Sequence, residues 1–231
     1  MNPREIVFDT ETTGLKPEEG HRIIQIGAVE LVGHIPTGRT YMALIDPGRD
    51  IDPAAEAVHG ISRAMLRDKP PFDAVVEDFL AFIEDAPLVA HNAEFDRNFL
   101  NAELERLARP PLPRSRFIDT LEIARNRWPG QKNTLDILCK RLGVDNSARD
   151  RHDALLDCQI LAEVYLELMG GRQQGLWLVA TGREKADARP RQLLMPAKIT
   201  SRPPRKHEPD EVERAAHQAF IARLKSAIWL R

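Results

Sequence analysis

The sequence of 231 residues carries 33 Lys and Arg against 35 Asp and Glu, a formal net charge of −2, and 42% hydrophobic residues. This is the composition of a soluble globular protein, and no apolar run reaches the roughly 18 residues that a membrane span needs. The charged residues Arg4, Glu5 and Asp9 near the start argue against a secretory signal peptide, so we expect a cytoplasmic protein with no membrane partner.

The net charge conceals a segregation of charge along the chain. Residues 1–170 hold 20 Lys and Arg against 29 Asp and Glu, a net of −9, whereas residues 171–231 hold 13 against 6, a net of +7. A chain of 170 residues can bury one core, while the proline-rich remainder has too few apolar clusters to fold alone. We therefore predict a domain at 1–170, a flexible linker at 171–207 and a separate C-terminal segment at 208–231.

Three strands open the predicted domain, and helices dominate the rest of it. Apolar patterning predicts strands at 5–12, 22–32 and 39–45, joined as a meander. Helical spacing and cap signals then predict, in chain order, a helix from Pro53 towards His59, a helix at 72–84, a buried strand at 87–91, and helices at 93–107, 120–127, 134–142 and 154–169. Strands followed by alternating strands and helices favour an α/β sandwich around a mixed sheet.

The two cysteines restrict the kinds of site that the domain can contain. Cys139 and Cys158 lie 19 residues apart and lack the C-x-x-C spacing. They form neither a disulfide framework nor a cysteine zinc site, and a reducing compartment is the simplest setting.

Two carboxylates share one face of the first predicted strand. Asp9 and Glu11 are two residues apart, and side chains alternate between the faces of a strand with a period of two. The preceding apolar residues 6–8 indicate a central strand, where neighbouring carboxylates are costly unless a cation neutralises them. Mg²⁺ and Mn²⁺ prefer such oxygen ligands. A lone D-x-E pattern, however, is more often a pair of solvated acids.

Three further polar residues fall at the starts of predicted helices. Asp96 is in the first turn of its helix, where the helix dipole favours an anion, and alone it is more simply a helix-start acid. His152 precedes the last helix of the domain and Asp157 lies about a turn inside it, so both can reach one cleft. Histidine can accept a proton near neutral pH. Taken alone, His152 is more simply a helix cap.

The four carboxylates and the histidine are more informative together than singly. Clustered acids repel unless divalent cations cancel their charge, and cation pairs stabilise the attacking and leaving oxygens of in-line phosphoryl displacement. The combination therefore predicts hydrolysis of a phosphodiester. A phosphohydrolase of the H-D type, suggested by His152-Asp153, is disfavoured because the other histidines of the domain fall at strand starts, loops or turns: His21, His34, His59 and His91.

Three sequence motifs resemble those of the DEDDh exonucleases. They are FDTETTG at 8–14, HNAEFD at 91–96 and HDALLD at 152–157, and the similarity extends to VHGI at 58–61 and NTLDILC at 133–139. Within this class the sequence resembles the proofreading (epsilon) subunits of bacterial DNA polymerase III. The resemblance implies a ribonuclease-H-like mixed β-sheet flanked by helices, and 3′→5′ removal of nucleotides from single-stranded or frayed DNA ends.

The same resemblance assigns expected roles to individual residues. Asp9, Glu11, Asp96 and Asp157 would bind two Mg²⁺ or Mn²⁺ ions, and His152 would be the general base, which completes the expected catalytic set. The residues expected to contact the terminal nucleotides of the substrate are Asp9, Thr10, Glu11, Thr12, His59, Asn92, Phe95 and Asp157. The catalytic pattern does not depart from that of the family, so we expect an active enzyme.

A short peptide directly after the domain suggests one partner. Residues 173–178, with Gln173, Leu176 and Leu178, resemble the Q-x-x-[LM]-x-[FL] peptide that binds the sliding (beta) clamp. In that mode an extended peptide places its apolar side chains in a pocket. Leu178 replaces the usual aromatic residue, the register could begin at Gln174, and a chance apolar cluster is the simpler alternative.

The C-terminal segment suggests a second partner. Residues 208–231 are predicted to form an apolar helical patch and resemble the segment that binds the catalytic (alpha) subunit of the polymerase. Exposed Phe220 and Trp229 would require a partner, since aromatic side chains are common interface anchors. A self-packing terminal helix is the alternative. A small theta-like subunit that binds the domain is a further expected partner.

Two other functions remain compatible with the sequence. One is a stand-alone DEDDh exonuclease that trims RNA or DNA 3′ ends, and the other is a mainly structural bridge between clamp and polymerase. With two divalent cations bound, the net charge of the domain would change from −9 to about −5. The near-zero net charge of the whole chain excludes tight autonomous DNA binding through a broad basic face, but it suits an enzyme that partners deliver to DNA.

Overall fold

The structure is a computed structural model that describes residues 3–149, 151–171 and 210–222. The chain divides into two compact units, Met1–Leu178 and Val179–Arg231. The predicted clamp peptide at 173–178 lies outside the described residues, as do the rest of the linker after Gly171 and residues 223–231 of the C-terminal segment. Among the helices described, none is both long and apolar enough to cross a membrane.

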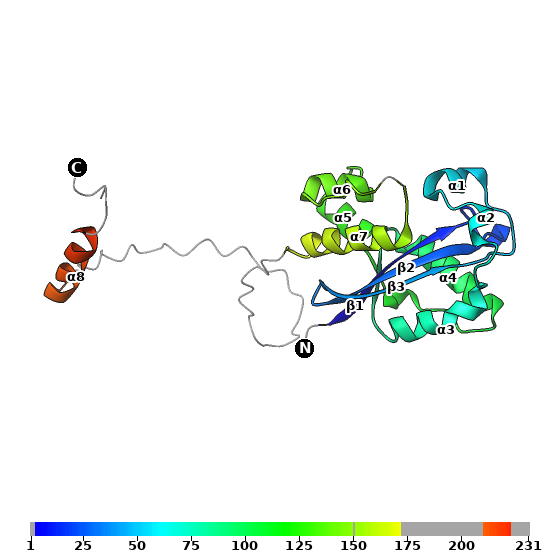
Figure 1. Cartoon of the computed structure of the whole chain (residues 1–231), viewed down its shortest axis with the longest axis horizontal. Coiled ribbons are helices and arrows are strands. Elements are labelled where there is room, and N and C mark those ends of the chain that lie inside the picture. Colours follow the sequence, from blue (N-terminus) through cyan, green and yellow to red (C-terminus); the bar gives the residue numbers. More distant parts are fainter. Residues whose placement is uncertain (1–2, 150, 172–209, 223–231) are drawn as a thin grey trace, which may run out of the picture. The chain divides into compact units, whose positions relative to one another are not determined.

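A mixed five-stranded sheet with the order β3-β2-β1-β4-β5 forms the centre of the domain (Figure 1). Its first three strands, β1 (Arg4–Thr12), β2 (Ile23–Val32) and β3 (Ile35–Leu44), form the predicted antiparallel meander. β4 (Leu88–Ala90) and β5 (Phe117–Asp119) add two parallel strands on the other side of β1. The predicted fold class, a mixed sheet flanked by helices, is confirmed. β5 was not predicted.

Helices cover both faces of this sheet, and the alternation of β1 assigns each face its own core. Ile6 and Phe8 lie in the cluster that includes α3 (Phe72–Ile83) and α4 (Ala93–Arg106), whereas Val7 lies in the cluster of α5 (Thr120–Arg127), α6 (Leu135–Leu142) and α7 (Ala154–Leu168). These five helices match the predicted ranges to within one residue at each end. Asp9 and Glu11, which have the parity of Val7, therefore face the side of α7.

Two short helices precede α3, and the ends of the longer helices lie close to the predicted positions. α1 (Pro53–His59) follows Asp52 as predicted, and α2 (Arg63–Leu66) was not predicted. Thr134 is the N-cap residue of α6, but its side chain makes no capping bond. α7 ends at Leu168, before Gly170 and Gly171, whose φ values of 113° and 73° are left-handed. Both cysteines are buried free thiols.

The start of α7 lies directly on β2, and a glycine makes this approach possible. A Cβ atom at Gly27 would lie 2.3 Å from the carbonyl carbon of Ala154. The Gln25 side chain accepts a hydrogen bond from the Ala154 N–H at 3.2 Å and donates to Asp153 Oδ2 at 2.9 Å. Because Gly27 pairs with Asp9 in the sheet, this contact brings the polar start of α7 beside Asp9.

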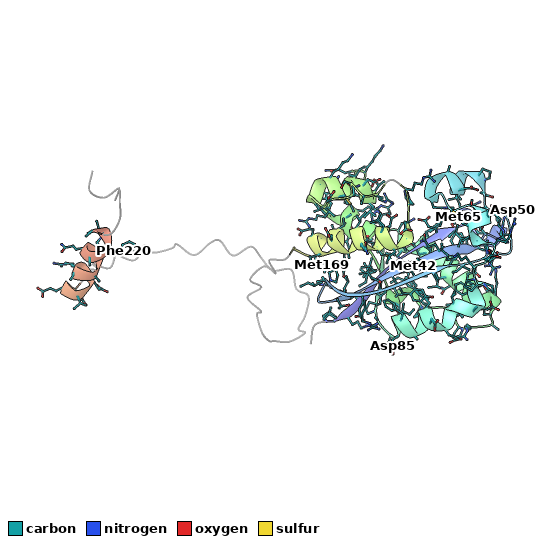
Figure 2. All side chains as sticks on the ribbon, viewed as in Figure 1. Met42, Asp50, Met65, Asp85, Met169 and Phe220 are labelled. Atoms are coloured by element: carbon teal, nitrogen blue, oxygen red, sulfur yellow. The ribbon has the colours of Figure 1, made fainter. Side chains whose placement is uncertain are left out.

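The second unit contains one described helix, α8 (Glu211–Ala222). Asp210 and Glu213 form a capping box at its start: the Glu213 N–H donates to Asp210 Oδ1 at 2.7 Å, and the Asp210 N–H donates to Glu213 Oε2 at 3.1 Å. No residue of α8 is buried, and Val212 and Phe220 are 78% and 59% exposed. Figure 2 shows Phe220 projecting from the helix. The helix lies inside the predicted segment 208–231, whose role stays a prediction.

Candidate active site

Glu11 occupies the end of β1 as a buried carboxylate without a full set of partners. It is 7% exposed, and its Oε1 has no hydrogen-bond partner among the described residues. The sheet register shifts between Glu11 and Thr12, a local irregularity of the kind that redirects side chains at the edges of sheets and near active sites. A buried carboxylate oxygen without a donor is costly, so this position favours a ligand.

Asp96 reaches the same end of β1 from the opposite face of the sheet. The Thr10 N–H and hydroxyl both donate to Asp96 Oδ1, at 3.0 and 2.7 Å. Thr10 stands between Asp9 and Glu11, so this pair of hydrogen bonds ties the first turn of α4 to the two acids of β1. Asn92, just before α4, adopts a left-handed φ of 69° and donates its N–H to Asp119 Oδ1 at 3.0 Å.

Asp157 and His152 come from the start of α7 and share an arginine. Arg149 donates to Asp157 through Nε at 2.5 Å and Nη2 at 2.7 Å. His152 Nδ1 lies 3.5 Å from Asp157 Oδ2, and Arg149 Nη2 lies within 3.2 Å of both His152 ring nitrogens. Asp157 is buried, whereas the His152 side chain is 47% exposed. Both side chains therefore reach one place, as their spacing in the sequence suggests.

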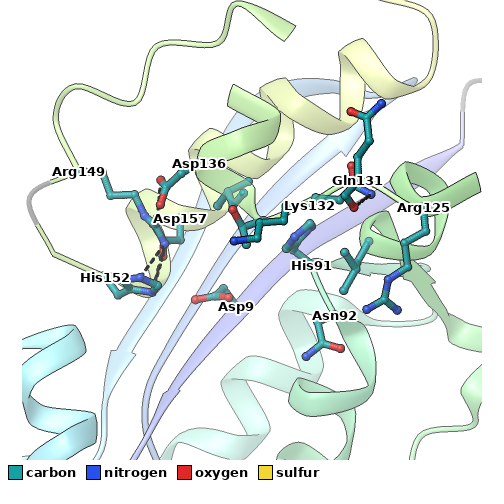
Figure 3. Close-up of a pocket in the computed structure, with 14 residues that line it drawn as sticks. Asp9, His91, Asn92, Arg125, Gln131, Lys132, Asp136, Arg149, His152 and Asp157 are labelled. Carbon is teal, nitrogen blue, oxygen red and sulfur yellow. Dashed lines mark hydrogen bonds and ion pairs between the residues drawn. The ribbon is translucent and has the colours of Figure 1, made fainter. Parts of the chain in front are cut away.

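Two cavities adjoin these acids. A cavity of about 620 Å³ is lined by Asp9, His152 and Asp157, together with Asn92 (Figure 3). A smaller cavity of about 360 Å³ is lined by several of the residues expected to contact the substrate: Thr10, Glu11, Thr12, His59 and Phe95. Asp96 lines neither cavity, but it accepts two hydrogen bonds from Thr10, the residue between Asp9 and Glu11. The structure thus gathers the predicted residues at one end of the sheet, while their roles stay predictions.

The carboxylates of the cluster have strongly raised pKa values. Burial raises the pKa of Asp9 well above its usual range, and the nearby Asp96, Glu11 and Asp157 raise it further. Burial, then Asp157 and Asp96, raises the pKa of Glu11 to about 8. Burial raises the pKa of Asp96 to about 7, although the hydrogen bonds from Thr10 act against this shift. The acids repel one another, so the site favours a bound cation.

The donor atoms at this place fit a hard divalent cation. One ligand atom each from Glu11, His152 and Asp157 all lie within 4.8 Å of one another. The partnerless Glu11 Oε1 and the raised carboxylate pKa values are both relieved by a cation with oxygen ligands. In this structure Arg149 is the positive group that both oxygens of Asp157 accept from, so a cation bound to Asp157 would compete with Arg149.

His59 presents a hydrogen-bond donor to the smaller cavity. Its Nδ1 accepts from the Ile61 N–H at 3.0 Å, so the proton of the neutral ring is on Nε2. Burial lowers the pKa of His59, which favours this neutral form. Nε2 is buried and has no partner among the described residues. The ring is therefore prepared to donate to a ligand.

Three contributors to the site were not predicted from the sequence. Arg149 holds Asp157, Asp119 fixes the backbone before α4, and Gly27 admits α7 to the sheet. Only Gly27 carried a local signal, because glycine inside a strand pattern often marks a close backbone approach. The other two depend on chain segments that meet only in three dimensions.

The comparisons with known proteins agree with this geometry. The family profile described as exonuclease matches residues 6–165. DNA polymerase III subunit epsilon of Rickettsia conorii is 52% identical over 179 residues, which cover 76% of this chain and 78% of that protein. The protein of the same name from Salmonella typhimurium is 48% identical over 177 residues, covering 73% and 72%.

Solved structures show the same fold. Exonuclease X in complex with 5′ overhanging duplex DNA has a TM-score of 0.56 and 31% identity, and the match covers 71% of this chain and 90% of that one. The nuclease domain of 3′hExo, a DEDDh family member bound to rAMP, has a TM-score of 0.64 at 19% identity, covering 73% and 92%. The second likeness concerns the fold alone.

Proposed function

The chain belongs to the exonuclease family, and from this premise we propose that it is the proofreading 3′→5′ exonuclease of a bacterial replicative DNA polymerase. The observation that carries the proposal is the meeting of Asp9, Glu11, Asp96, Asp157 and His152 at one end of the sheet. Relatives at about 50% identity are named as epsilon subunits of DNA polymerase III, which supports DNA as the substrate and the polymerase as the partner.

Divalent-metal dependence is general in the DEDDh class, and we assign Mg²⁺ or Mn²⁺ to this chain. Asp9, Glu11, Asp96 and Asp157 would hold two such ions, in keeping with the partnerless Glu11 oxygen and the raised carboxylate pKa values. When bound, the ions supply positive charge to the scissile phosphate and make the attacking water more acidic.

His152 is the residue that we assign to proton transfer. Burial and the neighbouring Arg149 lower its pKa, so the ring is neutral near pH 7 and one ring nitrogen can accept a proton from water once Arg149 gives way. Asp157, 3.5 Å from Nδ1, orients the ring. The partly exposed ring lines the larger cavity, where water and the phosphate can both reach it.

The smaller cavity suits the 3′-terminal nucleotide. Phe95 offers an apolar face there, and the partnerless His59 Nε2 offers a donor to a sugar hydroxyl or phosphate oxygen. Entry requires an unpaired end, and mismatched ends cost the least free energy to unpair. The selectivity for mispaired ends then comes from the DNA itself as much as from the site.

Partners would deliver the enzyme to its substrate in the bacterial cytoplasm. We assign the segment 208–231 to the polymerase catalytic (alpha) subunit, the peptide 173–178 to the sliding (beta) clamp, and a face of the domain to a small theta-like subunit. Support for the first assignment comes from α8, whose Val212 and Phe220 are exposed apolar side chains. The domain itself has an excess of acidic residues, which disfavours tight binding to DNA without a partner.

The decisive experiment compares paired and mispaired 3′ DNA ends, with and without the polymerase catalytic subunit. We expect faster removal of mispaired ends and stimulation by the subunit. Asp96→Asn should abolish cleavage, whereas Glu94→Gln, an exposed acid two residues earlier in the same turn, should not. An active Asp96→Asn variant would contradict the assigned site. Equal rates on both ends without stimulation would favour a stand-alone trimming enzyme.

A further inference from the structure

The wall of the larger cavity opposite the acids carries two basic side chains without an assigned role. Arg125 is on α5, and Lys132 is in the loop before α6. We propose that these two residues bind the backbone phosphates of the retained DNA strand, on the 5′ side of the scissile bond. This inference rests on the proposed exonuclease function and adds to it a binding site for the part of the substrate that is not removed.

The two basic residues are available for a ligand. Both are exposed and line the 620 Å³ cavity, and Figure 3 shows Lys132 extending towards Asp9 and Arg125 on the side of Asn92. Within the described part of the chain, neither side chain takes part in an ion pair or a hydrogen bond. Arg149, which lines the same cavity, is by contrast paired with Asp157 and Asp136.

The other charged groups near this wall do not neutralise it. Glu122 is one turn before Arg125 on α5, yet the two form no ion pair in the described structure. Asp136 lines the cavity, but its Oδ1 accepts from Arg149 at 2.8 Å. Burial lowers the pKa of His91, so that ring adds a neutral surface. Acidic groups therefore lie near both cations, but neither cation has an ion-pair partner among the described residues.

The positions of the cavities indicate which phosphates these cations meet. Glu11 lines the smaller cavity and Asp9 lines the larger, so the acids stand between the two. With the 3′-terminal nucleotide in the smaller cavity and the scissile phosphate at the acids, the strand continues into the larger cavity. Lys132 and Arg125 line that cavity, so the next phosphates, each with one negative charge, would pass them.

The contact predicted here is electrostatic and independent of base sequence. A lysine or arginine that neutralises one phosphate of a single strand contributes about 0.7 to the slope of log affinity against log salt concentration. Removal of such a residue weakens binding to all DNA sequences equally. This signature separates the proposed role from an effect on folding or on the reacting atoms.

The test uses the full-length chain with two substrates in the presence of Mn²⁺. One is a single-stranded oligonucleotide, and the other is a nitrophenyl ester of thymidine 5′-monophosphate, which has a scissile phosphodiester but no nucleotide on its 5′ side. For Lys132→Ala and Arg125→Ala we expect the ratio of kcat/KM for the oligonucleotide to that for the ester to fall about 5- to 10-fold each, with a salt slope lower by about 0.7.

The control variant is Lys140→Ala, an exposed lysine on α6 that does not line the cavity, and it should keep the wild-type ratio. An unchanged ratio and salt slope in the Lys132→Ala, Arg125→Ala double variant would overturn the proposal. An equal loss on both substrates would also overturn it, since the residues would then act on the scissile phosphate. Failure of the wild-type chain to cleave either substrate would instead contradict the proposed exonuclease function.

Discussion

The acidic end of β1 and the helix α8 differ in how their residues are held. At the acidic end, Asp96 is fixed by two hydrogen bonds from Thr10, and Asp157 by two from Arg149. In α8, the side-chain hydrogen bonds described are those of a capping box, and none of the helix residues is buried. The first arrangement suits a reaction site that is ordered before substrate arrives, whereas the second leaves apolar side chains exposed, as the proposed recruitment by a partner requires. Chemistry and recruitment should therefore be separable by mutation.

The largest effect is expected at the acidic end itself. Asp9→Asn removes a charge that we assign to metal binding but keeps the shape of a side chain in a paired strand. We expect exonuclease activity to fall about 10⁴-fold or more, since the lost cations account for several kcal/mol of transition-state stabilisation. Single-turnover kinetics measure this loss, and pull-down with the polymerase subunit should show unchanged recruitment. Normal exonuclease activity of the Asp9→Asn variant would contradict the assignment of Asp9 to the active site.

The next largest effect separates proton transfer from metal binding. His152→Ala should lower kcat by roughly 10²–10⁴-fold, the usual value of a general base. Mn²⁺ affinity, measured by titration calorimetry, should change little if the ring moves a proton. The ring also lies within 4.8 Å of ligand atoms of Glu11 and Asp157. A parallel loss of Mn²⁺ affinity would show that His152 is a metal ligand and refute its assignment as the base.

A moderate effect is expected in α8, and it should have the opposite profile. Phe220→Ala truncates an apolar side chain that is 59% exposed in this structure. We expect affinity for the polymerase catalytic subunit to fall about 30-fold, as for an interface anchor worth about 2 kcal/mol. Cleavage of the nitrophenyl ester should not change. Gln218→Ala, an exposed polar position on the same helix, is the matched control. If the Phe220→Ala variant bound the polymerase catalytic subunit with wild-type affinity, the assignment of α8 to recruitment would be contradicted.

The smallest effect concerns stability when divalent cations are removed with a chelator. The folded-state pKa of Glu11 is about 8, raised from 4.5, so between these values the folded chain binds more protons than the unfolded chain. Its unfolding free energy therefore decreases as pH rises from about 5 to 8. Glu11→Gln should flatten this dependence and raise stability at pH 8 by on the order of 1 kcal/mol. Thermal melts in EDTA test this, and a wild-type Tm that rises across the window would contradict it.

Much of the fold was predictable because its signals are local. The alternation around Asp9 and the helical spacing of α3 to α7 depend on neighbours within a few residues. The strand and the helices that these patterns predict are present in the structure. β5 escaped prediction because its three residues follow a proline-rich stretch and become a strand only by pairing Phe117 with Leu88. Its extended backbone comes from the sheet rather than from the propensity of its residues.

The residues of the candidate site were predictable where the position of an acid in a predicted strand or helix indicates where its side chain points. The sequence placed Asp9 and Glu11 on one strand face and Asp157 with His152 at one helix start. It could not show that Arg149 holds Asp157, because that contact depends on the path of the loop before α7. Nor could it show that Lys132 faces a cavity shared with Asp9, since a single exposed lysine carries no local signal.

The close contact between Gly27 and Ala154 bears on the mutation rate of a cell that uses this protein for proofreading. Any side chain at position 27 would meet the backbone of α7 and displace Asp157 and His152 from β1. On the proposed function, such a chain would keep α8 and still bind the polymerase, so copying would continue while errors remained in the daughter strand. A bacterium carrying a bulky residue at position 27 should therefore be a mutator. Its defect would lie at a residue outside the set that we assign to metal and DNA.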